Sequence, residues 1–215
     1  MATAVIDQTR AEPRPEPGPW QFLMERRHRI TVDEYHRMIE SGAFGPEPRV
    51  ELLEGVIVEK MIKKPPHIIA TDLLEDLLHH LIPRGNGYFI TMSNPVTIEE
   101  RDGEPEPDAG VYRGSIRDIA TRRRTPADAA LLAEVSDTSY NYDRQVKWVI
   151  YAAARVPVYW IVDLNRRQLE VHTEPNGEGE TAVYARTQIF GPDDLVPLTL
   201  DDREVGRFLV REILP

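Results

Sequence analysis

The chain has 215 residues and carries 26 Lys+Arg against 36 Asp+Glu, a formal net charge of −10 at pH 7. This length fits one domain with an appendage, and 41% hydrophobic with 29% charged residues is close to the average of soluble globular proteins. The lack of cysteine excludes disulfides, thiolate zinc sites and a cysteine nucleophile. No apolar run is long enough to cross a bilayer and no secretory signal is visible, so we expect a cytoplasmic, bacterial-type protein with no membrane partner.

The first 20 residues differ in composition from the rest of the chain. Four prolines alternate there with charged residues and glycine, namely Pro13, Pro15, Pro17 and Pro19. Such a segment cannot bury apolar area and favours extended conformations. Residues 1–20 are therefore predicted to be a disordered tail, and residues 21–215 to form a single domain.

Taken in chain order, the first structural signals predict a helix, a hairpin and a second helix. Thr31 and Glu34 form a capping-box pattern at the start of the first helix. Residues 49–60 are rich in β-branched side chains and broken by a Glu-Gly pair, which predicts two strands joined by a tight turn. Apolar residues then recur at helical spacing over 67–81, including Ile68 and Ile69.

The rest of the chain predicts a sheet with one more helix. Residues 129–136 are almost continuously apolar, as expected for a strand buried on both faces. Residues 141–155 have helical spacing, and residues 113–126 are predicted to be a loop with at most a helical turn. Shorter strands are predicted at 88–92, 96–99, 109–112, 158–163 and 168–172, with further strand-like pieces over 181–215. The order of elements predicts a mixed α/β (α+β) domain around one central sheet.

Acidic residues occupy unusual places in these apolar runs. Asp108 precedes a short strand, Glu134 lies within 129–136, and Glu51 interrupts another β-rich run. Burying a lone carboxylate costs several kcal/mol unless it is paired or bound to a metal. Carboxylates on neighbouring strands, with Lys147 on the following helix, fit a hard divalent cation that assists phosphate-ester hydrolysis, and they equally fit structural ion pairs. Spacing alone leaves both interpretations open.

Several segments resemble a known family. Pro107-Asp108 followed by Glu134-Val135-Ser136 is similar to the PD-(D/E)XK nuclease signature, with serine at the usual place of the lysine. The stretches VELLEGVIV, LLAEVSDTS and VPVYWIVD, together with a Pro-Pro-His turn before a Leu-rich helix, resemble the Uma family of restriction-endonuclease-like proteins. The resemblance extends over about residues 30–200.

The resemblance implies a restriction-endonuclease-like core, in which a central mixed sheet is flanked by helices. It also implies that Asp108, Glu134 and the Val135 carbonyl bind Mg²⁺, with Mn²⁺ as a substitute, and that Glu51 supports the ion through water. Lys147 would supply the missing lysine from the next helix and orient the attacking water or stabilise phosphoryl charge.

Three further residues are interpreted as structural. Asp143 is interpreted as a helix-start residue and Tyr151 as a packing residue, although both share a helix face with Lys147. His67 is expected to cap or pack its helix, and contact with the site is the alternative.

The implied function is Mg²⁺-dependent endonuclease hydrolysis of DNA phosphodiester bonds. Two alternatives stay open: a non-catalytic DNA-binding or protein-interaction module that keeps the nuclease fold, and a metal-dependent hydrolase acting on RNA or another phosphodiester. Residues 113–124, with five arginines and one aspartate, and the cluster of Lys60, Lys63 and Lys64 are candidates for phosphate contact, with solvated basic segments as the alternative. The β-rich C-terminal segment offers a surface for a homodimer, as in many nucleases of this superfamily.

Overall fold

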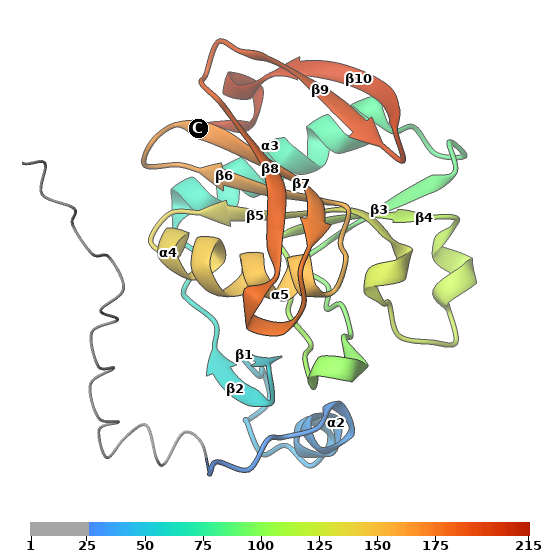
Figure 1. The fold of residues 1–215 in the computed structure, drawn as a ribbon, viewed down its shortest axis with the longest axis vertical. Helices are drawn as coiled ribbons and strands as arrows, with labels where there is room; N and C mark the ends of the chain where they lie inside the picture. Colours follow the sequence, from blue (N-terminus) through green and yellow to red (C-terminus); the bar gives the residue numbers. More distant parts are fainter. Residues whose placement is uncertain (1–25) are drawn as a thin grey trace, which may run out of the picture.

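The computed structural model describes residues 26–215 and is built around a six-stranded sheet with the order β3-β4-β5-β6-β7-β8 (Figure 1). The predicted tail, residues 1–20, lies outside the described residues. Strands β5 and β6 are parallel, and the other neighbouring pairs are antiparallel. The sheet strands are β3 (Tyr88–Met92), β4 (Ala109–Arg113), β5 (Ala129–Ser136), β6 (Val158–Asp163), β7 (Gln168–Asn176) and β8 (Val183–Phe190). The predicted mixed α/β architecture is confirmed.

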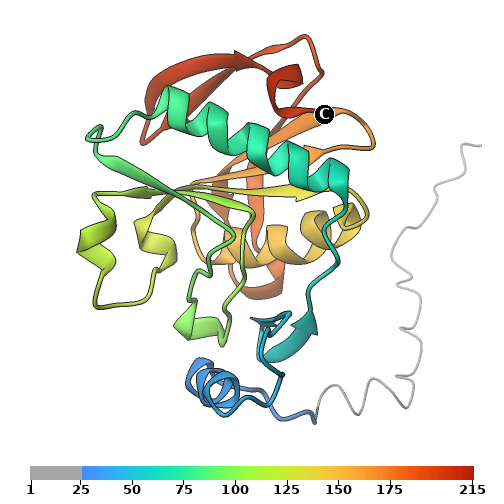
Figure 2. The same cartoon turned by 180° about the vertical axis from the view of Figure 1, so that it is seen from behind.

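Both faces of the sheet are covered. Helix α3 (Pro65–Leu81) and the hairpin of β9 (Leu195–Leu200) and β10 (Arg203–Leu209) lie on one face (Figures 1 and 2). A helical segment composed of α4 (Tyr140–Tyr142), the π-helical turn η4 (Asp143–Lys147) and α5 (Trp148–Ala153) lies on the other face. All eight residues of β5 are buried between these layers, as its apolar sequence predicts.

A small module of α2 (Val32–Glu40), β1 (Val50–Leu53) and β2 (Val56–Glu59) lies below the sheet in Figure 1. The predicted capping box before α2 is present. The predicted tight turn between β1 and β2 is also present, because Glu54 and Gly55 have φ values of 51° and 71°, the left-handed region that such turns require. A bridge between Leu52 and Glu104 joins the module to the segment before β4.

Two predicted elements differ from the structure. Residues 96–99 do not form a strand, because Val96 and Thr97 donate to carbonyls of different segments, at Pro105 and Arg124, and no ladder can develop. The helix predicted over 141–155 is interrupted by η4, in which the Trp148 amide donates to the Asp143 carbonyl five residues earlier. The remaining short helices are η1 (Glu99–Arg101), η2 (Ile116–Ile119), η3 (Pro126–Asp128), η5 (Gly179–Thr181) and η6 (Val210–Ile213).

Helix α3 buries a narrower stripe than its sequence predicts. Its buried side chains include Leu74, Leu77 and Leu78, which pack under the sheet, whereas Ile68 and Ile69 in the first turns are exposed. No helix of residues 26–215 has the length and apolar character needed to cross a membrane.

The core packing gives a direct test of the fold. Leu131 on β5 is fully buried in the cluster between the sheet and α3. We expect Leu131→Ala to lower the free energy of unfolding by about 2–5 kcal/mol, since it leaves a cavity that close packing cannot fill. Urea denaturation measures the loss. Ile116→Ala, at an exposed apolar residue, is the control and should change stability by less than about 0.5 kcal/mol.

Candidate functional site

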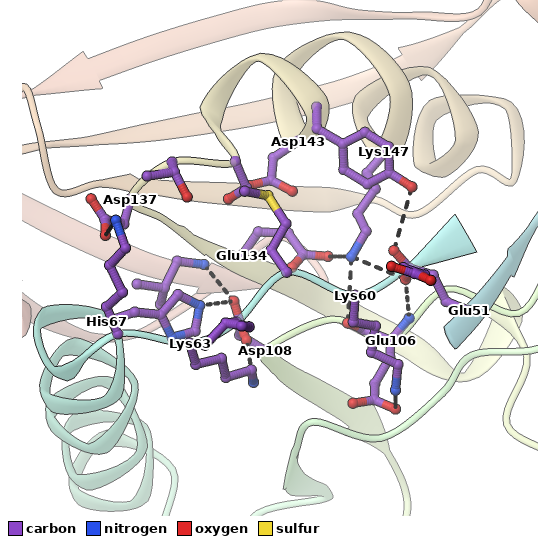
Figure 3. A pocket seen from close by; sticks show the side chains of 18 of the residues that line it. Glu51, Lys60, Lys63, His67, Glu106, Asp108, Glu134, Asp137, Asp143 and Lys147 are labelled. Atoms are coloured by element: carbon purple, nitrogen blue, oxygen red, sulfur yellow. Dashed lines mark hydrogen bonds and ion pairs between the residues drawn. The ribbon is translucent and has the colours of Figure 1, made fainter. Parts of the chain in front are cut away.

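A pocket opens where the carboxyl end of β5 meets η4, the start of α3 and the segment of residues 60–64, which we call the strap (Figure 3). The strap joins β2 to α3 without regular secondary structure. Every residue assigned to the site from sequence lines this pocket, namely Glu51, Asp108, Glu134, Val135 and Lys147. The structure therefore brings the predicted residues together, although their catalytic and metal-binding roles stay predictions.

The register of β4 and β5 places the two central carboxylates. Ala109 pairs with Ala133, so Asp108, immediately before β4, lies beside Glu134 on β5. The Val135 amide donates a hydrogen bond of 2.9 Å to Asp108 Oδ2. This bond ties the Asp108 carboxylate to the end of β5, so the two acids are held by the same part of the sheet.

Lys147 is buried between two carboxylates. Its Nζ lies 3.0 Å from Glu134 Oε1 and 3.3 Å from Glu51 Oε2. The Tyr151 hydroxyl also donates to Glu134 Oε1, at 3.1 Å. Burial alone would lower the pKa of Lys147, but the surrounding carboxylates, first Glu134 and then Glu51, outweigh it and hold the pKa well above its usual range. Lys147 is therefore a permanent cation.

The environment of Glu134, in contrast, disfavours the charged form of its side chain. Its burial raises its pKa well above the ordinary value, and the nearby carboxylates of Asp143, Asp108 and Glu51 act in the same direction, while Lys147 opposes them. Both hydrogen bonds to this carboxylate fall on Oε1. Additional positive charge near Glu134 would thus stabilise its ionised form.

Asp108 has three donors around its carboxylate. Lys63 Nζ lies 2.7 Å from Oδ1, and His67 Nε2 lies 3.1 Å from Oδ2, the oxygen that also accepts from Val135. Burial opposes ionisation of Asp108, but the hydrogen bond from His67 and the charge of Lys63 outweigh it and lower the pKa to about 2. Asp108 is therefore ionised at neutral pH.

Asp143 lies at the start of η4, near the expected helix start, and its carboxylate also connects η4 to β5. Its Oδ2 accepts hydrogen bonds from Ser136 at 2.7 Å and from Ser139 at 2.6 Å. Burial raises its pKa, and the charge of Lys147 opposes this. The serine that replaces the signature lysine thus fixes the first residue of η4 to β5, and the other end of η4 carries Lys147.

The pocket carries an excess of negative charge. Its lining includes seven carboxylates and four lysines, a formal excess of three negative charges with His67 neutral. Lys60 and Lys64 are themselves paired, with Glu106 at 2.5 Å and Asp137 at 3.9 Å. Among residues 26–215 no three His, Asp or Glu side chains are arranged to hold a metal ion together. A metal here would therefore use two carboxylates at most, completed by a backbone carbonyl and water.

The basic stretch 113–124 does not contribute to the pocket, since none of its arginines lines it. Arg113 pairs with Asp201, and Arg122 with Asp128 at 2.7 Å. Arg123 Nη1 lies 2.9 Å from Glu99, and Arg124 lies over the Tyr112 ring. These pairings favour a structural role for the stretch.

Sequence reasoning missed three contacts of the site. It favoured a capping or packing role for His67 and for Tyr151, but His67 contacts Asp108 and Tyr151 donates to Glu134. It placed Lys63 only in a basic cluster, whereas Lys63 contacts Asp108 directly. Two sequence patterns could have indicated these contacts. Lys147 and Tyr151 are four residues apart on one helix, and Lys63 is close in sequence to the Pro-Pro-His turn.

The lowered pKa of Asp108 predicts an acid-side loss of stability. Because this pKa is lowered from 3.8 to about 2, the ionised carboxylate contributes stability that is complete above pH 3.8 and is lost as the pH falls through about 2. We expect the stability difference between the wild type and Asp108→Asn to shrink between pH 4 and pH 2, as measured by urea denaturation at several pH values. A difference that is constant over this range would contradict the assignment. Asp72→Asn, at an exposed carboxylate on α3, is the control.

Comparisons with known proteins agree with this architecture. The crystal structure of a "putative nuclease belonging to DUF820" from Anabaena variabilis superposes with a TM-score of 0.62 at 16% identity, over 86% of this chain and 97% of that one. This likeness shows the fold. A search of curated proteins finds no match. Residues 32–203 match the model of the Uma2 family, described as "Putative restriction endonuclease". That match covers most of the chain, which therefore belongs to the Uma2 family.

Proposed function

We propose that this protein is a Mg²⁺-dependent endonuclease that hydrolyses phosphodiester bonds of DNA. The observation that carries the proposal is the convergence of Asp108 and Glu134 on adjacent strands, with Lys147 in contact with Glu134, at an open pocket. This is the arrangement of acids and one cation that metal-assisted hydrolysis requires. The family description and the description of the similar structure support the same class of activity.

The donor set fits a hard divalent cation. Asp108 and Glu134 offer carboxylate oxygens, the ligand type that Mg²⁺ prefers, and Val135 offers its carbonyl at the same strand end. Glu51 would support the ion through water. When bound, Mg²⁺ would activate water and neutralise charge that develops on the phosphate. The excess negative charge of the pocket and the raised pKa of Glu134 are both relieved by such a cation.

Lys147 would act as the catalytic cation. Its ammonium is fixed between Glu134 and Glu51, so it has little freedom to reorganise during the reaction. A preorganised buried cation stabilises developing negative charge more than a solvated one does. Tyr151 would position Glu134, and Asp143 would position η4, without contact with substrate.

The charge of the pocket also bears on the substrate. A phosphodiester anion is repelled by a pocket whose lining has more carboxylates than lysines, so a bound cation would favour substrate binding at this place. The proposal therefore couples DNA binding to metal binding. It places DNA over the strap side of the pocket, where Lys63 and Lys64 are the more exposed cations.

A second candidate is a non-catalytic module that keeps the nuclease fold. The observation in its favour is that Asp108, Glu134 and Glu51 each have a cationic partner in the protein itself. Ion pairs of this kind satisfy buried acids without a metal. Metal binding separates the two candidates.

The first experiment is a titration with Mg²⁺ and Mn²⁺ followed by calorimetry. We expect the wild type to bind, and Asp108→Asn and Glu134→Gln each to lose binding by about tenfold or more, because each removes a charged ligand. Asp137→Asn, at another carboxylate of the pocket, should bind as the wild type does. Equal loss in all three variants would indicate a general effect of charge. No binding by the wild type up to millimolar metal would favour the non-catalytic module.

Lys147→Met should separate the metal site from the chemistry. We expect the variant to retain Mn²⁺ binding and to cleave plasmid DNA about 100-fold more slowly, as expected when one preorganised charge is removed. Arg144→Met is the matched control, because Arg144 is also on η4 but contacts Glu170 outside the pocket. Normal cleavage by Lys147→Met would disprove the catalytic role. Parallel assays with RNA determine which polymer is the substrate.

A further inference from the structure

The carboxylate of Asp108 has no oxygen free of a protein donor. Oδ2 accepts from the Val135 amide and contacts His67, and Oδ1 contacts the Lys63 ammonium at 2.7 Å (Figure 3). Oδ1 keeps a second lone pair, but a metal bound there would lie beside the Lys63 ammonium on the same oxygen. Repulsion between the two cations therefore favours departure of the cationic donor when Asp108 coordinates a metal directly.

The three donors differ in their freedom to move. The Val135 amide belongs to β5, whose residues are all buried. His67 is on α3, its side chain is 12% exposed, and the Thr71 hydroxyl donates to the His67 carbonyl and lies 3.4 Å from its Nδ1. Lys63 lies on the strap, its side chain is 41% exposed, and four rotatable bonds connect its ammonium to the backbone. Its ammonium also donates to the Ser93 hydroxyl at 2.8 Å, an exposed hydrogen bond that its departure would break. Lys63 is therefore the donor that can leave with the least change to the fold.

We propose that Lys63 occupies the metal's place on Asp108 in the metal-free protein and leaves when a divalent cation binds. This inference depends on the proposed function, because it takes Asp108 to be a metal ligand. Lys63 offsets the negative charge of Asp108 beside Glu134 in the absence of metal. Its departure exposes a positive charge at the rim of the pocket, so that metal binding also makes the strap more attractive to an anionic substrate.

The neighbouring lysines show why Lys63 is distinctive. Lys60 pairs with Glu106 and Lys64 with Asp137, and neither contacts Asp108 or Glu134. Lys147 contacts Glu134, but it is buried and cannot leave without uncovering an unpaired charge. Within the described chain, Lys63 combines contact with a predicted ligand and access to solvent.

The first test is Mn²⁺ affinity measured by calorimetry for the wild type, Lys63→Met and Lys60→Met. We expect Lys63→Met to bind Mn²⁺ about fivefold more tightly, because the metal no longer displaces a half-exposed ion pair. Lys60→Met removes the same charge from the same pocket without touching Asp108, so it should change the affinity by less than about twofold. Equal tightening in both variants would mean that only the pocket's charge matters and would overturn the inference.

The outcomes distinguish this inference from the proposed function. If the wild type binds Mn²⁺ and Lys63→Met binds no more tightly, the displacement of Lys63 by metal is disproved, while the metal site is supported. If neither protein binds Mn²⁺, the metal site is disproved, and the displacement of Lys63 is disproved as well.

The second test observes Lys63 in the wild type. An amine-acylating reagent is applied with and without saturating Mg²⁺, and modified lysines are quantified by mass spectrometry. We expect acylation of Lys63 to rise about fivefold with Mg²⁺, since an amine released from Asp108 and Ser93 is more accessible to the reagent. Acylation of Lys64 should change by less than about twofold. Unchanged or reduced acylation of Lys63 would overturn the inference.

Discussion

The buried ammonium of Lys147, held between Glu134 and Glu51, is the constraint on which the site depends. Glu134 belongs to β5 of the central sheet, Glu51 to β1 of the small module, and Lys147 to η4. An unpaired charge in such a place is strongly destabilising, so the three groups must stay together. The ion pairs therefore fix the position of the module relative to the sheet. The Glu106 amide and the Tyr142 hydroxyl, which contact Glu51 at 3.2 Å and 3.5 Å, strengthen the same junction.

The π-helical turn follows from this constraint. Asp143 accepts hydrogen bonds from Ser136, at the end of β5, and from Ser139, just after that strand. Four residues later, Lys147 contacts Glu134, which also belongs to β5. The extra residue of a π turn adjusts the angle between these two attachments, and π turns are often found at functional sites. On the far side of η4, Arg144 lies 3.5 Å from Glu170 and 4.6 Å from the Trp148 ring, so the turn is held on two sides.

The parts of the site that could be predicted from sequence are those with a local signal. Glu134 is recognisable because it interrupts a continuous apolar strand. The Glu54-Gly55 pair indicates a tight turn, which requires left-handed backbone conformations. For the contacts of Lys63 and His67 with Asp108, the closeness of Lys63 to the Pro-Pro-His turn is a weak signal, because each contact joins residues more than 40 positions apart. They depend on where the strap crosses the end of the sheet. The π turn also lacks a sequence signature, because it is imposed by its attachments.

The stretch 113–124 shows how local charge in a sequence can mislead. Its formal excess of positive charge suggests a phosphate-binding face, yet three of its five arginines, Arg113, Arg122 and Arg123, pair with Asp201, Asp128 and Glu99. Carboxylates instead outnumber lysines in the lining of the pocket. Such a pocket repels a polyanion until a cation enters. Under the proposed function, the same excess of acid, which appears unfavourable for nucleic-acid binding, would make that binding conditional on metal.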